Sequence, residues 1–394
     1  MPVIDIDSHF EPTANWLEEF PALKAKLPER FPTDDPRFTM RSAEMFAYFV
    51  TDDLLRGVPR EQRMPMDRLV TAGMREKYDP NRGPEAGYPG SDQHQQLVTT
   101  ADRLAWMDEQ GIDVQNVISG AGYTLARAIH DPVLGMEALE AVNTWMSDHL
   151  ADAGNRLITA TSLRFEDLDW VIRELTRMRE RGNRTFLLPG EPTGDIPPNH
   201  PSYDRLWSAV VDLGMIPIVH VGLSPVIYHP AWANTDDPAI IRMISTLGHA
   251  GAPFLTGMVL GGVFERHPNL TVVFAEHGID WITPLTFRLD AMAQPGMSPL
   301  LIGDYKWPLS PADYVRRNVR ITPLPVPHES PVGLLEWLPT LPILSSDYPH
   351  FEGNGDPMGH YDKELASVPE DARTQFLGGN IAECFARMGD PIAV

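Results

Sequence analysis

The chain has 394 residues, 43% of them apolar, and it carries 32 basic against 54 acidic residues for a formal charge of −22. This composition supports a sizeable core, either one large barrel or two ordinary domains, while the negative charge argues against nucleic acid and anionic lipid as partners. With a single cysteine, Cys384, and no run of about 18 to 20 apolar residues, the sequence predicts a cytoplasmic protein without a disulfide or membrane span.

Short apolar segments rich in β-branched residues alternate with longer amphipathic segments, which is typical of βα units repeated around a parallel sheet. We expect eight strands, at 2–7, 114–119, 157–162, 185–188, 215–221, 271–276, 319–322 and 341–346. The expected helices cover 98–111, 136–153, 166–182, 202–213, 237–266, 280–292, 311–317, 330–338 and 369–388. Eight such units predict a (β/α)8 TIM barrel followed by a C-terminal helical segment.

The largest insertion in this pattern lies between the first two expected strands. Residues 12–97 are rich in Pro, Arg, Asp and Met and do not fit the βα repeat. A segment that leaves the C-terminal end of a barrel strand is well placed to cover an active site or to contact another subunit. We therefore expect 12–97 to be a lid or an oligomer-contact subdomain within a single 1–394 domain, and a homodimer is the default assembly.

Side chains able to bind a metal follow four of the eight expected strands, at the ends where barrel enzymes carry their chemistry. They are Asp7 and His9 on the first strand, His220 on the fifth, His277 on the sixth and Asp347 on the eighth. Strict alternation also places Asp5 on the same face as Asp7 and His9. Ionised carboxylates and neutral imidazoles gathered at one barrel mouth can together hold a divalent metal.

Asp347 raises the clearest question, because it ends an apolar segment in which an unpaired carboxylate would be costly. A bound cation beside it would explain its presence. His350 and Glu352 follow closely, and we expect them either to support the ligands or a second metal, or to tie down the loop. Glu276 neighbours His277, so strict alternation sends it to the opposite face, where a hydrogen bond toward the helices is the preferred interpretation unless the strand has already ended.

This order of residues resembles the amidohydrolase superfamily, and within it the amidohydrolase-related branch of hydrolases and nonoxidative decarboxylases, similar to aminocarboxymuconate-semialdehyde decarboxylase-like enzymes. The resemblance is carried by Asp7-x-His9, His220, His277 and Asp347, by the segments 262–273 and 346–350, and by Gly379-Asn380. It covers nearly the whole chain except 12–97. The chain has Asp-x-His where that branch usually has His-x-His or Glu-x-His. Its fourth strand has no lysine, so the carbamylated lysine that bridges two metals in the binuclear hydrolases is not available.

The resemblance implies that Asp7, His9, His220 and Asp347 bind a divalent metal and that His277 acts as an acid or base beside it. Zinc is the expected metal, with manganese or iron(II) as alternatives. Such a cation lowers the pKa of bound water towards about 7 or polarises a substrate oxygen. His277 can then move protons with an ordinary pKa of about 6.5, and Asp347 can also accept a proton from water.

The expected function is the hydrolysis or nonoxidative decarboxylation of a small carboxylated or aromatic compound. Both reactions use the same five residues, so the sequence does not separate them, and it identifies no substrate-binding residue. Two alternatives stay open. Asp7, Glu276, His350 and Glu352 could hold a second iron or manganese, as in a nonhaem dinuclear oxygenase of the same superfamily. The chain could also be a non-catalytic partner subunit that keeps its metal for structure.

Overall fold

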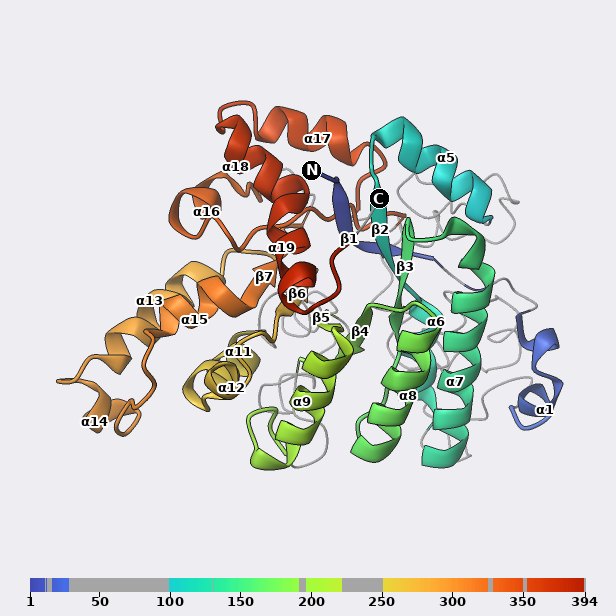
Figure 1. Ribbon diagram of the computed structural model, residues 1–394, viewed down its shortest axis with the longest axis horizontal. Helices are drawn as coiled ribbons and strands as arrows, with labels where there is room; N and C mark the ends of the chain where they lie inside the picture. The colour runs from blue at the N-terminus through green and yellow to red at the C-terminus, as the bar shows by residue number, and fades with distance from the viewer. Residues whose placement is uncertain are drawn as a thin grey trace, which may run out of the picture.

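The structure is a computed structural model that describes residues 1–10, 12, 16–27, 99–129, 131–190, 196–221, 251–324, 329–349 and 353–392. Its central element is a curled sheet of seven parallel strands in the order β1-β2-β3-β4-β5-β6-β7 (Figure 1). The strands are β1 Ile4–His9, β2 Val114–Ile118, β3 Leu157–Thr161, β4 Thr185–Leu188, β5 Ile216–His220, β6 Val272–Ala275 and β7 Val319–Ile321. Each corresponds to a strand expected from the periodicity of the sequence.

The expected eighth strand, 341–346, is an extended segment without regular strand pairing. Its Ile343 N–H donates to Ile321 O of β7 at 3.1 Å, and Ile6 N–H of β1 donates to Leu344 O at 3.2 Å. Pro342 has no N–H to donate, which limits the ladder that this segment can form. The segment nevertheless connects the two edge strands of the sheet, and the arrangement is consistent with a TIM-barrel amidohydrolase fold.

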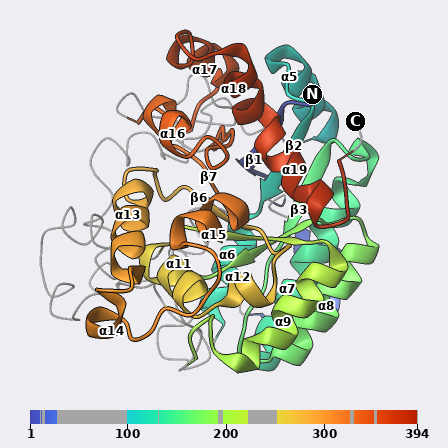
Figure 2. The ribbon, with the colours of Figure 1, turned by 60° about the vertical axis from the view of Figure 1, so that its left-hand side comes forward.

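Helices alternate with the strands. They are α1 Pro21–Lys24, α5 Thr100–Gln110, α6 Gly120–Ala128, α7 Pro132–His149, α8 Leu168–Glu180, α9 Asp204–Leu213, α11 Gly251–Leu260, α12 Val263–Arg266, α13 Ile282–Ala293, α14 Ser298–Leu301, α15 Pro311–Asn318, α16 Val332–Trp337, α17 Pro357–Glu364, α18 Glu370–Thr374 and α19 Asn380–Arg387. Helices α6, α14 and α17 were not expected from the sequence. Figures 1 and 2 show α7, α8 and α9 side by side on one side of the sheet.

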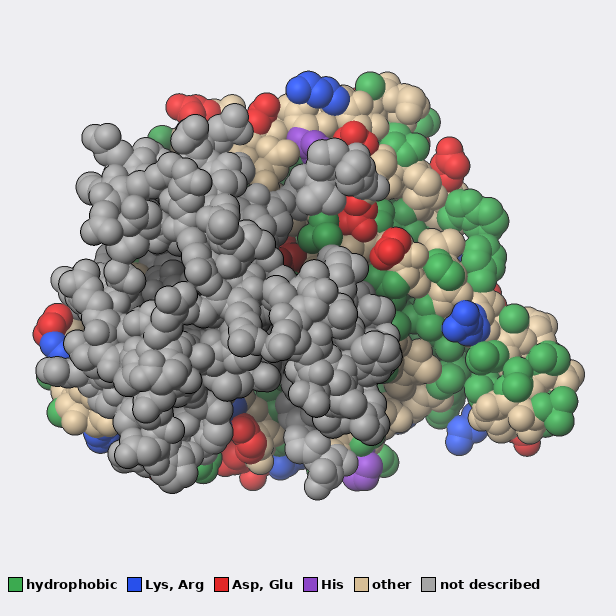
Figure 3. Space-filling view, turned by 180° about the vertical axis from the view of Figure 1, so that it is seen from behind, with side chains coloured by type: hydrophobic (Ala, Val, Ile, Leu, Met, Phe, Trp, Pro, Cys, Tyr) green, Lys and Arg blue, Asp and Glu red, His purple; other side chains and the backbone are tan. Residues whose placement is uncertain are grey.

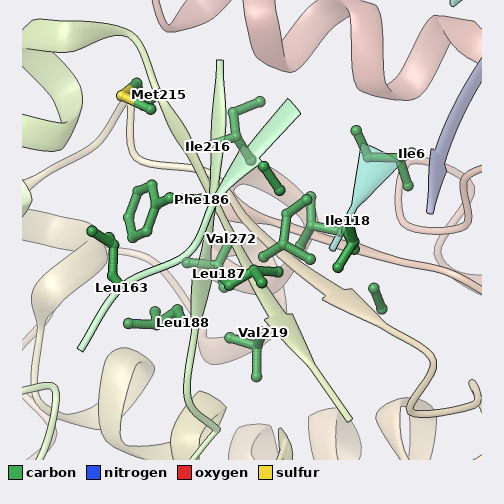
Figure 4. Close-up of a cluster of buried hydrophobic side chains, with 14 of the residues drawn as sticks. Ile6, Ile118, Leu163, Phe186, Leu187, Leu188, Met215, Ile216, Val219 and Val272 are labelled. Carbon is green, nitrogen blue, oxygen red and sulfur yellow. The ribbon is translucent and has the colours of Figure 1, made fainter. Parts of the chain in front are cut away.

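Every residue of β1 to β7 is buried. The apolar ones pack together in the cluster of Figure 4, where Ile6, Ile118, Phe186 and Ile216 come from four different strands. Parallel sheets are covered on both faces, so their strands are apolar almost throughout. A polar side chain on one of these strands is therefore removed from water and needs a partner or a ligand.

Large apolar side chains are exposed on α13, α14 and α16. Leu300 is 81% exposed, and the rings of Phe287 and Trp337 meet edge to face at 5.1 Å. Green side chains gather at the lower right of Figure 3, where α14 lies. This surface does not identify a partner, so the homodimer stays a prediction.

Most of the expected insertion 12–97 lies outside the described residues, and its role as a lid or contact subdomain stays a prediction. Its described part includes a 3-10 turn, Trp16–Glu19, and α1. Across the described residues, none of the helices combines the length and the apolar character that a membrane crossing requires.

Candidate metal centre

The strand β1 carries two of the predicted ligands next to an irregularity. Its pairing with β2 shifts register between Asp5 and Ser8, as in a β-bulge. A bulge turns side chains out of strict alternation. Asp5 does not join Asp7 and His9 in a group of ligand atoms, and its carboxylate accepts a hydrogen bond from Gln115 of β2 at 2.7 Å.

The four predicted ligands lie together at the mouth of the sheet. His9 Nε2 is 3.1 Å from Asp347 Oδ1 and 3.7 Å from Asp7 Oδ1. His220 Nε2 lies 3.4 Å from Asp7 Oδ1. Three possible ligand atoms lie within 4.8 Å of one another, one each from Asp7, His9 and His220. This spacing is close enough to surround a single cation. Side chains from β1, from the end of β5 and from the segment that follows 341–346 thus meet at one point.

Glu276 joins this group, which is the outcome left open for a strand that has already ended. β6 ends at Ala275, and Glu276 follows with a φ of 59°. Because the strand has already ended, alternation no longer determines where the side chain points. Glu276 Oε2 lies 3.2 Å from His220 Nε2, and Glu276 forms a second group of ligand atoms with His9 and Asp347.

Two of the acidic residues at this site have an unusual backbone conformation. Among the described residues, Glu276 and Asp347, with φ values of 59° and 50°, are the only non-glycine residues with positive φ. Such conformations cost about 1 to 3 kcal/mol each and persist where the surroundings enforce them. Here Asp347 N–H donates to Asp7 O at 2.8 Å, and Gly353 packs so closely that a Cβ on it would lie 2.2 Å from Asp347 O.

The ring of His220 is oriented for a ligand role. Its Nδ1 lies 2.8 Å from Val221 O, and since a carbonyl only accepts, Nδ1 donates and Nε2 is the nitrogen that faces the carboxylates. Burial lowers the pKa of His220, but the charge and hydrogen bond of Asp7 outweigh burial and raise the pKa above its ordinary value of 6.5. Asp347 adds to this effect through its charge.

The donor set fits a divalent cation. Asp7 is completely buried, and among the described residues its carboxylate faces the imidazole nitrogens of His220 at 3.4 Å and of His9 at 3.7 Å. A buried carboxylate is costly, and a cation beside it reduces that cost. Asp7, Glu276 and Asp347 with two imidazoles form an oxygen and nitrogen set that suits zinc, manganese or iron(II). β4 has no lysine, so no carbamylated lysine is available to bridge two metals.

His277 lies beside this group but belongs to neither set of ligand atoms. It is 2% exposed, its ring packs edge to face on Phe274, and neither ring nitrogen has a hydrogen-bond partner among the described residues. Burial, and to a lesser degree the nearby His220, lower the pKa of His277 to about 3. The expectation of an ordinary pKa is therefore wrong, because the ring is removed from water. At neutral pH His277 is a neutral imidazole with one N–H to donate and one lone pair.

The comparisons with known proteins concern the family and the fold of the chain. A family model described as amidohydrolase matches residues 4–301. The chain belongs to the amidohydrolase family. No curated protein matches it in sequence.

Solved structures resemble this amidohydrolase over its whole length. An amidohydrolase from Mycobacterium avium subsp. paratuberculosis K-10 is 20% identical with a TM-score of 0.69, over 98% of this chain and 99% of that one. The 5-carboxyvanillate decarboxylase from Sphingomonas paucimobilis is 21% identical with a TM-score of 0.66, at the same coverage. A dihydroxybenzoic acid decarboxylase from Polaromonas sp. JS666, with bound manganese and an inhibitor, is 16% identical with a TM-score of 0.61, over 98% and 97%. At these identities the likeness establishes a shared fold.

Glu329 is a residue near the site that sequence reasoning missed. Its Oε1 accepts a hydrogen bond from Ile279 N at 2.6 Å, and its Oε2 accepts one from Leu324 N. It therefore connects the loop that follows β6, which carries Glu276 and His277, with the loop that follows β7. No pattern in the sequence relates these distant positions. His350 and Glu352 lie outside the described residues, so their predicted supporting roles are untested.

Proposed function

We propose that this amidohydrolase is a metal-dependent, nonoxidative decarboxylase of a small aromatic carboxylic acid. The observation that carries the proposal is the burial of its polar centre: Asp7 is 0%, Asp347 1% and His277 2% exposed. Decarboxylation converts a charged carboxylate into neutral CO₂, so a site that excludes water favours it. Hydrolysis, by contrast, needs a water molecule and a base. With a pKa lowered to about 3, His277 is a weak base.

Asp7, His9, His220 and Asp347 would hold the cation, with Glu276 within reach. When bound, the cation would supply positive charge that polarises the oxygens of the substrate. The N–H of neutral His277 can donate a hydrogen bond to a substrate oxygen and so orient the ring. We propose that Asp347 takes up a proton from solvent and passes it to the ring carbon that loses the carboxylate, so that an aromatic acid anion and a proton yield the arene and CO₂.

The metal itself is part of the proposal. Zinc is the metal expected from the sequence, but the acidic donor set suits manganese equally, because carboxylate oxygens are hard ligands. The decarboxylase from Polaromonas sp. JS666 has bound manganese, and it and the 5-carboxyvanillate decarboxylase act on aromatic acids. These relatives support a divalent metal and an aromatic substrate.

A single cation fits better than the pair that a dinuclear oxygenase requires. The two groups of ligand atoms found among the described residues both include His9. One cation that draws its ligands from both groups uses this shared residue once.

The test is an assay of the purified protein loaded in turn with zinc or manganese, against a panel of hydroxybenzoates and methoxybenzoates that carry a carboxylate. Release of CO₂ with a proton from solvent at the vacated ring carbon would support the proposal. Incorporation of ¹⁸O from labelled water into the product would identify a hydrolase instead. Two redox-active ions per chain with consumption of O₂ would favour the oxygenase.

A further inference from the structure

Beneath the candidate ligands lies a second group of buried polar residues. Asp5 of β1 is completely buried, and each of its oxygens accepts hydrogen bonds. Its Oδ1 accepts from Ser346 N at 3.0 Å and from Asp7 N at 3.3 Å. Its Oδ2 accepts from Ser346 Oγ at 2.6 Å and from Gln115 Nε2 at 2.7 Å. Asp5 thus holds the backbone of one ligand, Asp7, and of the residue that precedes another, Asp347.

Arg103 of α5 lies at the other end of this group and is also completely buried. Its Nη1 donates to Gln115 Oε1 at 3.2 Å, and its Nη2 donates to His9 O at 2.5 Å. Its guanidinium lies 4.8 Å from the centre of the Tyr348 ring, which follows Asp347 directly. Arg103 therefore contacts the backbone of the ligand His9 and the residue next to the ligand Asp347.

Gln115 connects the two ends in one possible orientation. An arginine only donates hydrogen bonds and an ionised aspartate only accepts them. The amide of Gln115 must therefore present its oxygen to Arg103 and its NH₂ to Asp5, as the structure shows. Turning the amide over would place two donors together at one end and two acceptors at the other. The three side chains form a chain of hydrogen bonds with a fixed direction.

We propose that Asp5, Gln115 and Arg103 form a positioning network that sets the spacing of the metal ligands on β1 and on the 345–348 segment. The inference rests on the metal site of the proposed function and extends it to residues that touch neither metal nor substrate. Both ends of the network bind backbone groups of segments that carry candidate ligands: Arg103 binds the carbonyl of His9, and Asp5 binds the N–H groups of Asp7 and Ser346. Groups that orient ligands in this way typically change metal affinity by about 10- to 100-fold when they are altered.

The variant Asp5→Asn tests the network with little change of shape. An asparagine keeps one acceptor oxygen and replaces the other with a donor, so two of the four hydrogen bonds to Asp5 lose their acceptor. A second variant, Gln115→Met, keeps both charged ends and removes the connection between them. Because it is apolar and of similar length, it offers an independent test if Asp5→Asn does not fold.

The matched control is Glu174→Gln on α8. Glu174 is, like Asp5, a buried carboxylate, with 2% of its surface exposed. It accepts hydrogen bonds from Asn143 at 2.8 Å and from Arg177 at 2.7 Å. None of these three residues lies on a segment that carries a candidate ligand. We expect this variant to lower the melting temperature while leaving the metal site unchanged.

The experiment uses Co²⁺ as the probe, added to metal-free full-length protein. The dissociation constant is measured by competition with a chelator, and the visible absorption of Co²⁺ reports the ligand geometry. We expect Asp5→Asn and Gln115→Met to weaken Co²⁺ binding by about 10-fold or more and to alter the spectrum, with Glu174→Gln matching the wild type in both.

A folded Asp5→Asn or Gln115→Met variant with wild-type affinity and spectrum would overturn the network and leave the proposed function standing. Wild-type protein that binds Co²⁺ and shows the expected variant effects, but releases no CO₂ from any aromatic acid, would overturn the decarboxylase proposal alone. Wild-type protein that binds no Co²⁺ would overturn both.

Discussion

Two regions of the same sheet satisfy their buried polar groups in opposite ways. Around β3 and β4 the groups pair with one another: Thr159 Oγ1 donates to Asn183 Oδ1 at 2.6 Å, and Asn183 Nδ2 donates to Thr161 Oγ1 at 3.0 Å. At the mouth formed by β1, β5, β6 and the 345–348 segment, the Asp7 carboxylate faces the rings of His220 and His9, and His277 has no hydrogen-bond partner among the described residues. Burial is the same in both regions, so burial alone does not mark a site.

The difference has a physical meaning. A buried polar group without a partner is costly, and native structures hold few of them. Where several carboxylates and imidazoles converge, we propose that a cation is the further partner. On this proposal the β3 and β4 region is complete as it folds, whereas the mouth of the sheet completes its contacts by binding an ion. The predictions that follow test this distinction, beginning with the largest expected effect.

Asp347→Asn should remove both metal and turnover. The amide keeps the size of the side chain but loses the negative charge that faces His9 at 3.1 Å. We expect metal affinity and the rate of CO₂ release to fall by at least about 100-fold, as measured by elemental analysis and product assay. Unchanged metal content in the purified variant would argue that Asp347 is not a ligand.

His277→Gln should change the pH dependence of stability. The pKa of His277 is lowered to about 3 in the folded protein, against an ordinary value of 6.5. The unfolded chain therefore binds a proton that the folded chain does not, and stability falls as pH drops from 6.5 towards 3, by up to about 1.4 kcal/mol per pH unit. Glutamine does not titrate, so the free energy of unfolding of the variant should depend less on pH than that of the wild type. Urea unfolding of metal-free protein between pH 4 and 7 measures this dependence. Identical slopes would show that His277 is not held neutral.

Glu276→Gln should weaken metal binding less than Asp347→Asn does. Glu276 faces His220 Nε2 at 3.2 Å but is 11% exposed, so water can replace part of its contribution. We expect a loss of affinity of about 10-fold, which corresponds to about 1.4 kcal/mol. A chelator competition assay measures it, and an affinity equal to that of the wild type would place Glu276 outside the ligand set.

Thr159→Val, in the region around β3 and β4, should lower the stability of the protein without changing its metal binding. It removes the donor to Asn183 and leaves a buried amide oxygen without that partner. We expect a loss of about 1 to 3 kcal/mol in the free energy of unfolding, with metal content unchanged. A variant that lost metal as well would show that the two regions are not independent.

The strands and the convergence of the four candidate ligands could be predicted because each leaves a local mark on the sequence. Apolar β-branched runs identify β1 to β7, and His220 and Asp347 stand directly at the ends of such runs. The extended segment 341–346 was harder to assign, because an apolar run has the same appearance whether or not its backbone pairs regularly. Pro342 is the one local sign that the ladder is interrupted.

The orientation of Glu276 stayed open in the sequence because it depends on where the strand ends and on a positive φ, which the sequence does not indicate at a glutamate. The pKa of His277 was misjudged for a related reason, since it depends on how completely the fold excludes water. Arg103 and Glu329 act through backbone groups far away in the sequence, and such contacts leave no periodic signal. What the sequence reveals is therefore the chemistry of the ligands, and what it conceals is the geometry that orients them.

The most direct test of the central claim is the metal content of the purified wild-type protein beside that of Asp7→Asn. The account predicts one divalent cation per chain in the wild type and a loss of that cation in the variant, with the fold retained by circular dichroism. A wild type that binds no cation under saturating zinc or manganese, or a folded variant that keeps it, would contradict the claim that Asp7 is buried to hold a metal.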